Sequence, residues 1–310
     1  MERSRWGTWA PVLILMGLVA LSGLASFEAL GRLNAPSLYS NRAAPPGRAF
    51  TVRRPVLLIV LDGLRDDAAR SMPTLQRMAQ RGASARLVAG VPTFSAAGYV
   101  TLLTGTTPFA SGRRTNMRLF PAAVDAVPTQ LRSAGRTARV LSDEVDWWRT
   151  LLPEAFSEVT VLPPAELIGR AEAWMAASDL LVVHLCGIDA AGHTDGAGSA
   201  AYRDAVRAAD AQVARLLARW GDRGVVTVVS DHGHTLGGGH GGAEEEVRNT
   251  WWVASGPGVA PHTEEVVPST DVAPTLAAWL GAPPPAHAEG STLVEWIDAP
   301  PTVREQLRNQ

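Results

Sequence analysis

The sequence predicts an α/β fold with a mostly parallel central sheet and helices on both faces, preceded by an N-terminal membrane segment. Three observations predict it: short apolar runs, amphipathic stretches between those runs, and one charge-free segment near the N-terminus. Continuous apolar runs are typical of strands that are buried on both faces. Their alternation with helical stretches indicates strand–helix–strand units, in which neighbouring strands run parallel.

The N-terminal segment Trp6–Phe27 has no charged residue over 22 positions. As an α-helix it would be about 33 Å long, which is enough to cross a bilayer. Arg3 and Arg5 precede it, and the positive-inside rule then places the N-terminus in the cytoplasm and the rest of the chain outside. We therefore expect a single-pass cell-membrane protein with an extracytoplasmic domain. The tripeptide Gly23-Leu24-Ala25 is a weak signal-peptidase pattern, so secretion after cleavage is the alternative.

The chain divides into four parts. Residues 1–28 form the signal-anchor, with membrane contact expected over residues 6–27, and residues 29–54 form a flexible linker rich in Pro, Gly, Asn, Ser and Arg. Residues 55–300 form the folded domain, and residues 301–310 a C-terminal tail.

Five buried strands and six helices are expected within the folded domain. The strands are Val56–Leu61, Thr137–Leu141, Asp179–Leu185, Val225–Val229 and Trp251–Ala254. The helices are Pro73–Gln80, Ala96–Leu103, Val127–Arg132, Glu166–Met175, Ala200–Trp220 and Asp271–Leu280. Sheets of this kind carry their functional sites on loops at the carboxyl ends of the strands.

Composition excludes several classes of function. The 28 basic residues against 30 acidic ones give a formal net charge of -2, which leaves no positive field to bind nucleic acid. Every basic residue is arginine, and this excludes a Schiff-base lysine, a P-loop lysine and a kinase lysine. Cys186, the single cysteine, cannot form an internal disulfide or a thiolate zinc site. Any metal must therefore be held by Asp, Glu, His or hydroxyl groups.

Three predicted strands lead directly into metal-ligating side chains. Asp62 follows the first strand, Asp189 and His193 follow the third, and Asp231 and His232 follow the fourth. Because the carboxyl ends of parallel strands meet at one edge of the sheet, we expect these groups to converge. Carboxylate and imidazole donors suit zinc or manganese.

Three further histidines lie in the same part of the sequence. His184 is inside an apolar run and is expected in the core or behind a ligand, and His234 is expected either behind a ligand or in solvent. His240 lies in the glycine-rich segment 237–242, where the backbone can fold back toward His232. We favour His240 as a ligand, with a flexible exposed loop as the alternative.

Ser95 is the candidate nucleophile. It precedes a predicted helix, where free N–H groups and the helix dipole would favour a bound phosphoryl group. An ordinary N-cap serine would have the same sequence context, so the segment alone leaves both interpretations open.

Taken in order, these motifs resemble the alkaline phosphatase superfamily, and within it the type I phosphodiesterase/nucleotide pyrophosphatase branch. The ethanolamine-phosphate transferases of GPI-anchor synthesis look like close relatives. The resemblance spans residues 55–297 and rests on the following segments: Leu58–Arg65, Pro92–Ser95, Asp189–His193, Ser230–Gly233, Gly239–Gly241, Asn249–Val253 and Asp271–Gly290.

The resemblance implies an alkaline phosphatase-like fold with two divalent metal ions, usually zinc, with manganese as the alternative. One implied site consists of Asp62, Ser95, Asp231 and His232, and the other of Asp189, His193 and His240. Ser95 would be phosphorylated transiently, and water or an acceptor alcohol would then attack the phosphoserine.

The chain departs from the nucleotide pyrophosphatases at three points. Those enzymes carry a threonine nucleophile, an asparagine three positions later and a distant third histidine, where this chain has Ser95, Gly98 and the nearby His240. This spacing looks more like that of the transferases. Another donor must hold the non-bridging phosphate oxygens, and the candidates are Arg113, Arg114 and Asn116.

The predicted function is a metal-dependent phosphodiesterase or phosphatase that acts on an extracytoplasmic phosphate ester, such as a nucleotide or a lipid head group. The alternatives are a phosphoethanolamine-type transferase and an anchored module that binds a ligand without catalysis. A sulfatase is disfavoured, because neither Cys186 nor Ser95 is followed by the x-Pro-x-Arg sequence of a formylglycine motif.

Overall fold

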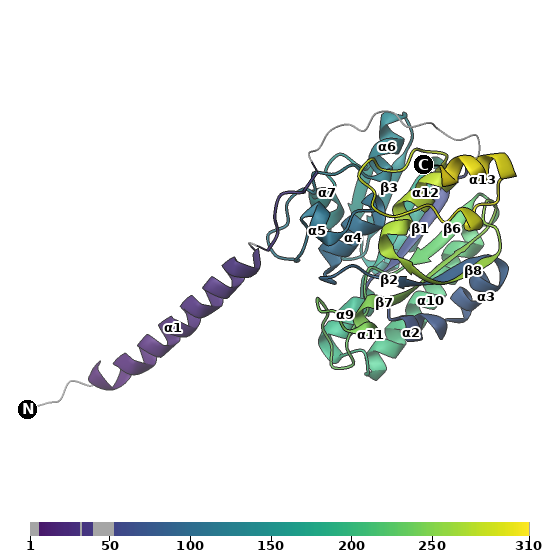
Figure 1. Cartoon of the computed structure of the whole chain (residues 1–310). Helices are drawn as coiled ribbons and strands as arrows, with labels where there is room; N and C mark the ends of the chain where they lie inside the picture. The colour runs from purple at the N-terminus through teal and green to yellow at the C-terminus, as the bar shows by residue number, and fades with distance from the viewer. Residues whose placement is uncertain (1–5, 32, 40–52, 310) are drawn as a thin grey trace, which may run out of the picture.

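The computed structural model of the chain describes residues 6–31, 33–39 and 53–309. Arg3, Arg5 and most of the predicted linker lie outside the described residues. The folded body is an α/β sandwich in which helices cover both faces of one sheet (Figure 1).

The sheet has eight strands in the order β4-β3-β5-β1-β6-β7-β2-β8. Only β7 runs antiparallel to its neighbours, and every other neighbouring pair is parallel, so the prediction of a mostly parallel sheet is confirmed. The strands are β1 (Val56–Leu61), β2 (Ala83–Val88), β3 (Ala138–Ser142), β4 (Glu158–Val161), β5 (Leu180–Leu185), β6 (Val225–Val229), β7 (Asn249–Ser255) and β8 (His262–Pro268).

Three of these strands have no continuous apolar run and are not predicted from the sequence. The two edge strands, β4 and β8, are largely exposed and contain glutamates, while β2 consists mainly of small and polar residues. Tertiary pairing, rather than their own apolar pattern, makes these segments strands.

The helices occupy the stretches between the strands. They are α1 (Trp6–Gly31), α2 (Asp66–Arg70), α3 (Pro73–Arg81), α4 (Ser95–Thr104), α5 (Pro108–Ser111), α6 (Val127–Ser133), α7 (Trp147–Leu151), α8 (Pro164–Trp174), α9 (Gly187–Asp195), α10 (Ala200–Trp220), α11 (Glu245–Arg248), α12 (Val272–Leu280) and α13 (Pro301–Arg308). Three short 3₁₀ turns accompany them: Met175–Ala177, Ser269–Asp271 and Val294–Trp296.

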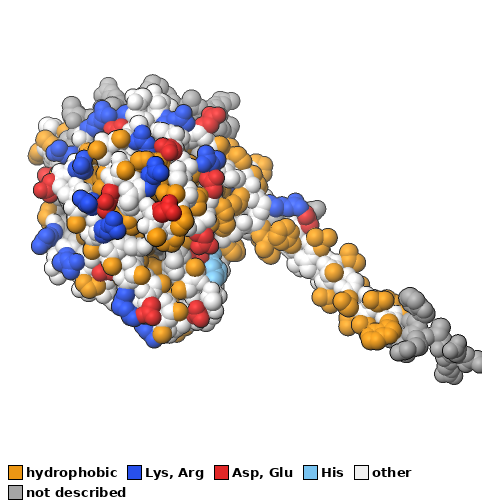
Figure 2. Space-filling model, turned by 180° about the vertical axis from the view of Figure 1, so that it is seen from behind, with side chains coloured by type: hydrophobic (Ala, Val, Ile, Leu, Met, Phe, Trp, Pro, Cys, Tyr) orange, Lys and Arg blue, Asp and Glu red, His pale blue; other side chains and the backbone are white. Residues whose placement is uncertain are grey.

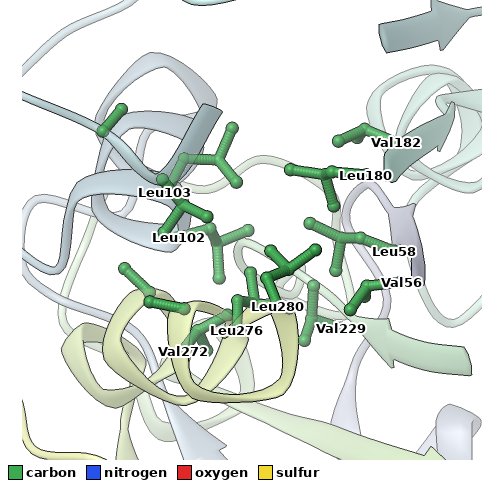
Figure 3. Packing of buried hydrophobic residues seen from close by; sticks show 14 of the residues in the cluster. Val56, Leu58, Leu102, Leu103, Leu180, Val182, Val229, Val272, Leu276 and Leu280 are labelled. Carbon is green, nitrogen blue, oxygen red and sulfur yellow. The ribbon is translucent and has the colours of Figure 1, made fainter. Parts of the chain in front are cut away.

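Each face of the sheet has its own hydrophobic core, because successive strand side chains point to opposite faces. In β1, Val56 and Leu58 belong to one core, and Leu57 and Ile59 to the other. The first core packs α4 and α12 against β1, β5 and β6 (Figure 3). The second core packs α3, α8 and α10 against the opposite face. The six residues of β1 are fully buried, so the strand that carries Asp62 at its end is fixed between the two cores.

Helix α1 projects from the body, and none of its residues between Trp9 and Leu30 is buried (Figure 1). Its segment Trp9–Leu30 has a mean hydropathy of 2.1, and the apolar side chains along it are exposed (Figure 2). Charged side chains of both signs are scattered over the body in the same view. The helix is long and apolar enough to cross a membrane, and so large an exposed apolar surface is unfavourable in water.

Candidate active site

The three central strands bring the predicted site residues to one edge of the sheet. β5, β1 and β6 are parallel neighbours, so their carboxyl ends lie side by side. Asp62 follows β1, while Asp231 and His232 follow β6. Helix α9 follows β5 and carries Asp189 and His193 one turn apart on the same face.

The first group of converging side chains is Asp62, Asp231 and His232. All three are buried, and their potential ligand atoms lie within 4.8 Å of one another. His232 Nε2 is 3.4 Å from Asp62 Oδ1 and 3.3 Å from Asp231 Oδ2. Among the described residues, neither of these carboxylate oxygens has a hydrogen-bond donor. Buried carboxylate oxygens without partners are costly, and a cation between them would remove that cost.

The other oxygen of Asp62 is held by two donors. Tyr99 donates its hydroxyl hydrogen to Oδ2, and His184 Nε2 lies 3.0 Å from the same oxygen. The indole N–H of Trp148 donates to His184 Nδ1 at 3.1 Å, so the proton of the neutral ring is on Nε2 and points at Asp62. His184 therefore orients Asp62 and has no free lone pair for a metal. Burial alone would raise the pKa of Asp62, but the hydrogen bonds from His184 and Tyr99 outweigh it and lower the pKa.

Asp231 has the opposite shift. Burial, and then the charges of Asp62 and Asp189, raise its pKa well above the usual range. Burial also lowers the pKa of His232, which keeps the ring neutral. His232 Nδ1 lies 3.1 Å from the carbonyl oxygen of Gly233 and donates to it, so the lone pair is on Nε2, between the two carboxylates. The group has the donor atoms of a cation site.

A second group contains Asp189, His193, His234 and His240, again with ligand atoms within 4.8 Å of one another. His193 Nε2 lies 3.0 Å from His240 Nε2 and 3.4 Å from Asp189 Oδ2. His240 Nδ1 donates to the carbonyl oxygen of Thr93 at 2.9 Å, which leaves the Nε2 lone pair free. Burial lowers the pKa of His240 to about 3, so the ring is neutral at neutral pH.

His234 has a different hydrogen-bond pattern from His240. The backbone N–H of Gly239 donates to its Nδ1 at 3.1 Å, so the ring proton is on Nε2. That proton is donated to Asp189 Oδ1 over 2.6 Å. The sequence leaves two positions open for His234, behind a ligand or in solvent. The structure buries the His234 side chain, which orients Asp189.

The two groups are direct neighbours. The rings of His232 and His240 stack with centroids 3.8 Å apart and an interplanar angle of 17°. His193 is the most exposed member, with about half of its side chain accessible, whereas His232 and His240 are buried. The site therefore opens to solvent on the side of His193.

Ser95 is the first residue of α4, and its Oγ lies 3.0 Å from His232 Nε2. Phe94 occupies the N-cap position, and the contacts of the Ser95 hydroxyl among the described residues are with His232 and Asn116. Asn116 accepts a hydrogen bond from the N–H of Ala96 through Oδ1 at 3.0 Å, and its Nδ2 is 3.5 Å from Ser95 Oγ. Because Asn116 satisfies an N–H at the start of the helix, the hydroxyl of Ser95 is free to face the first group.

The sequence model of type I phosphodiesterases/nucleotide pyrophosphatases matches residues 56–112 and 109–240. The chain belongs to this family. Both groups of site residues and Ser95 lie within the matched range.

Curated relatives of this phosphodiesterase-family protein include the catalytic subunit of mouse GPI ethanolamine phosphate transferase 3. It is 29% identical over 273 residues, which cover 74% of this chain and 24% of the relative. The chain thus spans about a quarter of the length of that relative.

Solved structures with the same fold include an inactive form of murine ectonucleotide pyrophosphatase/phosphodiesterase 5 in complex with AMP. Its TM-score is 0.65 at 15% identity, and the match covers 77% of this chain and 98% of that one. A 2-O GAG sulfatase gives a TM-score of 0.64 at 16% identity, covering 82% of this chain and 74% of that one. At these identities the likeness shows the fold, which is that of the alkaline phosphatase superfamily.

Among the three predicted phosphate-holding residues of this phosphodiesterase-family protein, the structure brings only Asn116 to Ser95. The Arg113 guanidinium is buried against the ring of Phe120 and donates to the Phe120 carbonyl. The Arg114 guanidinium stacks over Phe109 and donates to the Phe109 carbonyl. Both cations are thus directed to backbone oxygens and apolar rings rather than to the site.

Two supporting residues are not found by the sequence reasoning. Tyr99 lies one helical turn after Ser95, and this spacing could have placed it on the same face of α4. Thr93 holds the glycine-rich loop, since its Oγ1 accepts from the N–H of Gly241 at 2.9 Å. The glycine at position 98 also has a structural reason, because a Cβ there would lie 2.7 Å from Cβ of Asp231.

Proposed function

We propose that this protein is a metal-dependent phosphoryl-transfer enzyme that acts through a phosphoserine at Ser95. The observation that carries the proposal is the position of the Ser95 hydroxyl, which contacts His232 at the junction of two carboxylate–imidazole groups. Family membership supports chemistry on phosphate esters.

The residues fit two divalent ions. We assign Asp62, Ser95, Asp231 and His232 to one ion, and Asp189, His193 and His240 to the other; the unpartnered oxygens of Asp62 and Asp231 support the first assignment. Carboxylate and imidazole ligands without thiolate suit zinc, with manganese as the alternative. Divalent ions at such a site stabilise negative charge on the phosphoryl group and its attacking and leaving oxygens.

The side chains of the protein carry the covalent steps. The Oγ of Ser95 loses its proton and forms a bond to phosphorus as the bond from phosphorus to the leaving oxygen breaks, and the leaving oxygen takes up a proton to give the free alcohol. In the second step an oxygen of water loses a proton and forms the new bond to phosphorus, while the Oγ–phosphorus bond breaks and the Oγ of Ser95 takes up a proton. Asn116, with its N–H group beside Ser95 Oγ, binds a non-bridging phosphoryl oxygen through both steps.

Transfer to an alcohol is the second candidate, and the similarity to an ethanolamine phosphate transferase favours it. The two reactions share the first step and differ in the molecule that attacks the phosphoserine. The ratio of transfer product to free phosphate with increasing ethanolamine or glycerol separates them.

We further propose that the substrate is an extracytoplasmic phosphate ester and that α1 anchors the catalytic domain, residues 55–300, to the cell membrane. The apolar length of α1 supports the anchor, and a secreted form would follow if the segment were cleaved. A nucleotide and a lipid head group are the two substrate types that the family similarity supports. The structure of the murine relative contains bound AMP, which is a nucleotide.

The proposal is tested with the full chain in detergent and chromogenic phosphate mono- and diesters. We expect hydrolysis that zinc or manganese supports, that a chelator abolishes and that Ser95→Ala lowers by several orders of magnitude. Metal binding without turnover of any ester would instead identify an anchored binding module.

A further inference from the structure

We infer that the short segment between the membrane helix and the folded body positions a phosphate-binding residue of the active site. The segment, residues 33–39, is here called the strap. It lies outside the residues that carry the predicted ligands, yet it is packed against the loop that presents Asn116 to Ser95. The inference rests on the proposed function, because it assigns the strap to the binding of the phosphoryl group.

Asn34 connects the strap to that loop. Its side chain is buried, and its Oδ1 accepts hydrogen bonds from the N–H groups of Arg114 at 2.7 Å and Thr115 at 3.0 Å. Its Nδ2 donates to the carbonyl oxygens of Thr115 at 3.2 Å and Met117 at 2.7 Å. A carboxamide has two acceptor and two donor positions, and Asn34 uses all four.

These four bonds bracket Asn116. The carbonyl groups on both sides of Asn116 are held by one amide nitrogen of Asn34, so the backbone at position 116 cannot shift without breaking them. At position 34 an aspartate would lack the two donors, and an alanine would lack all four groups.

The rest of the strap follows the same loop. The N–H of Ala35 donates to the Gly112 carbonyl at 3.0 Å, and the N–H of Leu38 donates to the Ala110 carbonyl at 2.8 Å. Gly112 has a φ of +75°, and a Cβ there would lie 2.1 Å from the carbonyl oxygen of Ala35. A glycine at this position is therefore required for the strap to approach so closely. The backbone conformation of the loop at Gly112 thus matches the path of the strap.

The consequence is a positioning role for Asn34. Asn116 makes two contacts at the catalytic end of α4, with the N–H of Ala96 and with Ser95 Oγ. A donor that stabilises charge in a transition state must be held in place before the reaction, and a displacement of about 1 Å can cost about a hundredfold in rate. Because Asn34 lies three positions after the end of α1, the strap also connects the proposed membrane anchor to the phosphoryl-binding loop (Figure 1).

The test uses the full chain in detergent, with Asn34→Ala, Asn116→Ala and the double variant. We expect Asn116→Ala to lower kcat about a hundredfold and Asn34→Ala to lower it about tenfold or more, each with zinc affinity unchanged. The double variant should be no slower than Asn116→Ala alone, because Asn34 acts through Asn116. The affinity for inorganic phosphate, measured by calorimetry, should fall in both single variants.

The matched control is Asp210→Ala. Asp210 accepts hydrogen bonds from the N–H and hydroxyl of Thr74 and so ties two helices together on the opposite face of the sheet. We expect it to lower the unfolding temperature without a change in phosphate affinity. Asn34→Asp, which keeps the acceptors and loses the donors, covers the case in which the alanine variant does not fold.

Three outcomes separate failure of this inference from failure of the proposed function. Normal kcat and phosphate affinity in Asn34→Ala or Asn34→Asp, with a strong loss in Asn116→Ala, would overturn the strap inference alone. Full additivity of the two losses would overturn it as well. If Asn116→Ala is itself fully active, the phosphate-binding role assigned to Asn116 is wrong, and the strap inference is overturned with it.

Discussion

Replacing Asp231 by asparagine should change the stability of the protein in opposite directions with and without divalent metal. The ligand atoms of Asp62, Asp231 and His232 lie within 4.8 Å of one another, and the pKa of Asp231 is raised by burial and by Asp62 and Asp189. Without a cation, ionising both carboxylates this close together would cost about 3.5 kcal/mol of repulsion at an effective dielectric constant of 20.

In metal-free protein, Asp231→Asn removes this repulsion while keeping the shape of the side chain. We expect it to stabilise the fold by about 2–3 kcal/mol, which raises the unfolding temperature by about 5–10 °C. In metal-saturated protein the same change removes a ligand. A metal present at about a thousand times its dissociation constant contributes about 4 kcal/mol of stability, and most of that would be lost.

The pH dependence follows from the same geometry. Because the folded-state pKa of Asp231 is raised, metal-free protein binds more protons when folded than when unfolded. Its stability should therefore fall as pH rises from about 4 toward neutrality, and Asp231→Asn should remove that slope.

The assay is thermal unfolding in detergent after dialysis against a chelator, and again with zinc added. Asp125→Asn is the control, since Asp125 is also buried but is satisfied by Gln130, Ala286 and His287, away from the site. We expect the control to destabilise the protein under both conditions. If Asp231→Asn also destabilises it equally with and without metal, the group is not a cation site and the reasoning fails.

Three further predictions follow from other parts of the structure. Gly192→Ala should weaken zinc binding about 10–100-fold in a metal titration, because its Cβ would lie 2.6 Å from the His234 ring that holds Asp189; unchanged affinity would show that His234 is dispensable. Asp179→Asn should lower the free energy of unfolding by about 1–2 kcal/mol at neutral pH. Burial raises the pKa of Asp179, but hydrogen bonds from the Thr137 N–H and from the Arg53 and Arg136 side chains outweigh it and lower the pKa to about 2. The stability that Asp179 contributes is therefore present above pH 4 and lost toward pH 2. A destabilisation that persists at pH 2 would argue against that origin. The protein should fractionate with membranes, and protease added to intact cells should cleave its catalytic domain. A soluble cytosolic protein would contradict the proposed topology.

The central part of the fold is predictable from the sequence because its strands are buried on both faces. β1 and β6 match the predicted bounds residue for residue, since each is a continuous apolar run. The edge strands β4 and β8 carry no such pattern, and only pairing with a neighbour makes them strands.

The candidate site divides in the same way. Side chains that directly follow buried strands, such as Asp62 and His232, can be located from the sequence, because strand ends fix their positions. Which ligand each orienting residue contacts cannot be predicted in this way. Tyr99 and His184 meet Asp62 only after α4 and β5 pack against β1, and Asn34 reaches its loop across 80 positions of sequence.

Trapping of the phosphorylated enzyme tests the central claim most directly. Rapid acid quenching of wild-type protein with an isotopically labelled phosphate ester should leave the label on the peptide that contains Ser95, whose Oγ faces His232. Added ethanolamine or glycerol should divert part of the label from free phosphate to a transfer product. Ser95→Ala should show no labelled protein and turnover reduced by several orders of magnitude, with zinc affinity largely retained. Near-normal turnover of Ser95→Ala without a labelled intermediate would contradict the account.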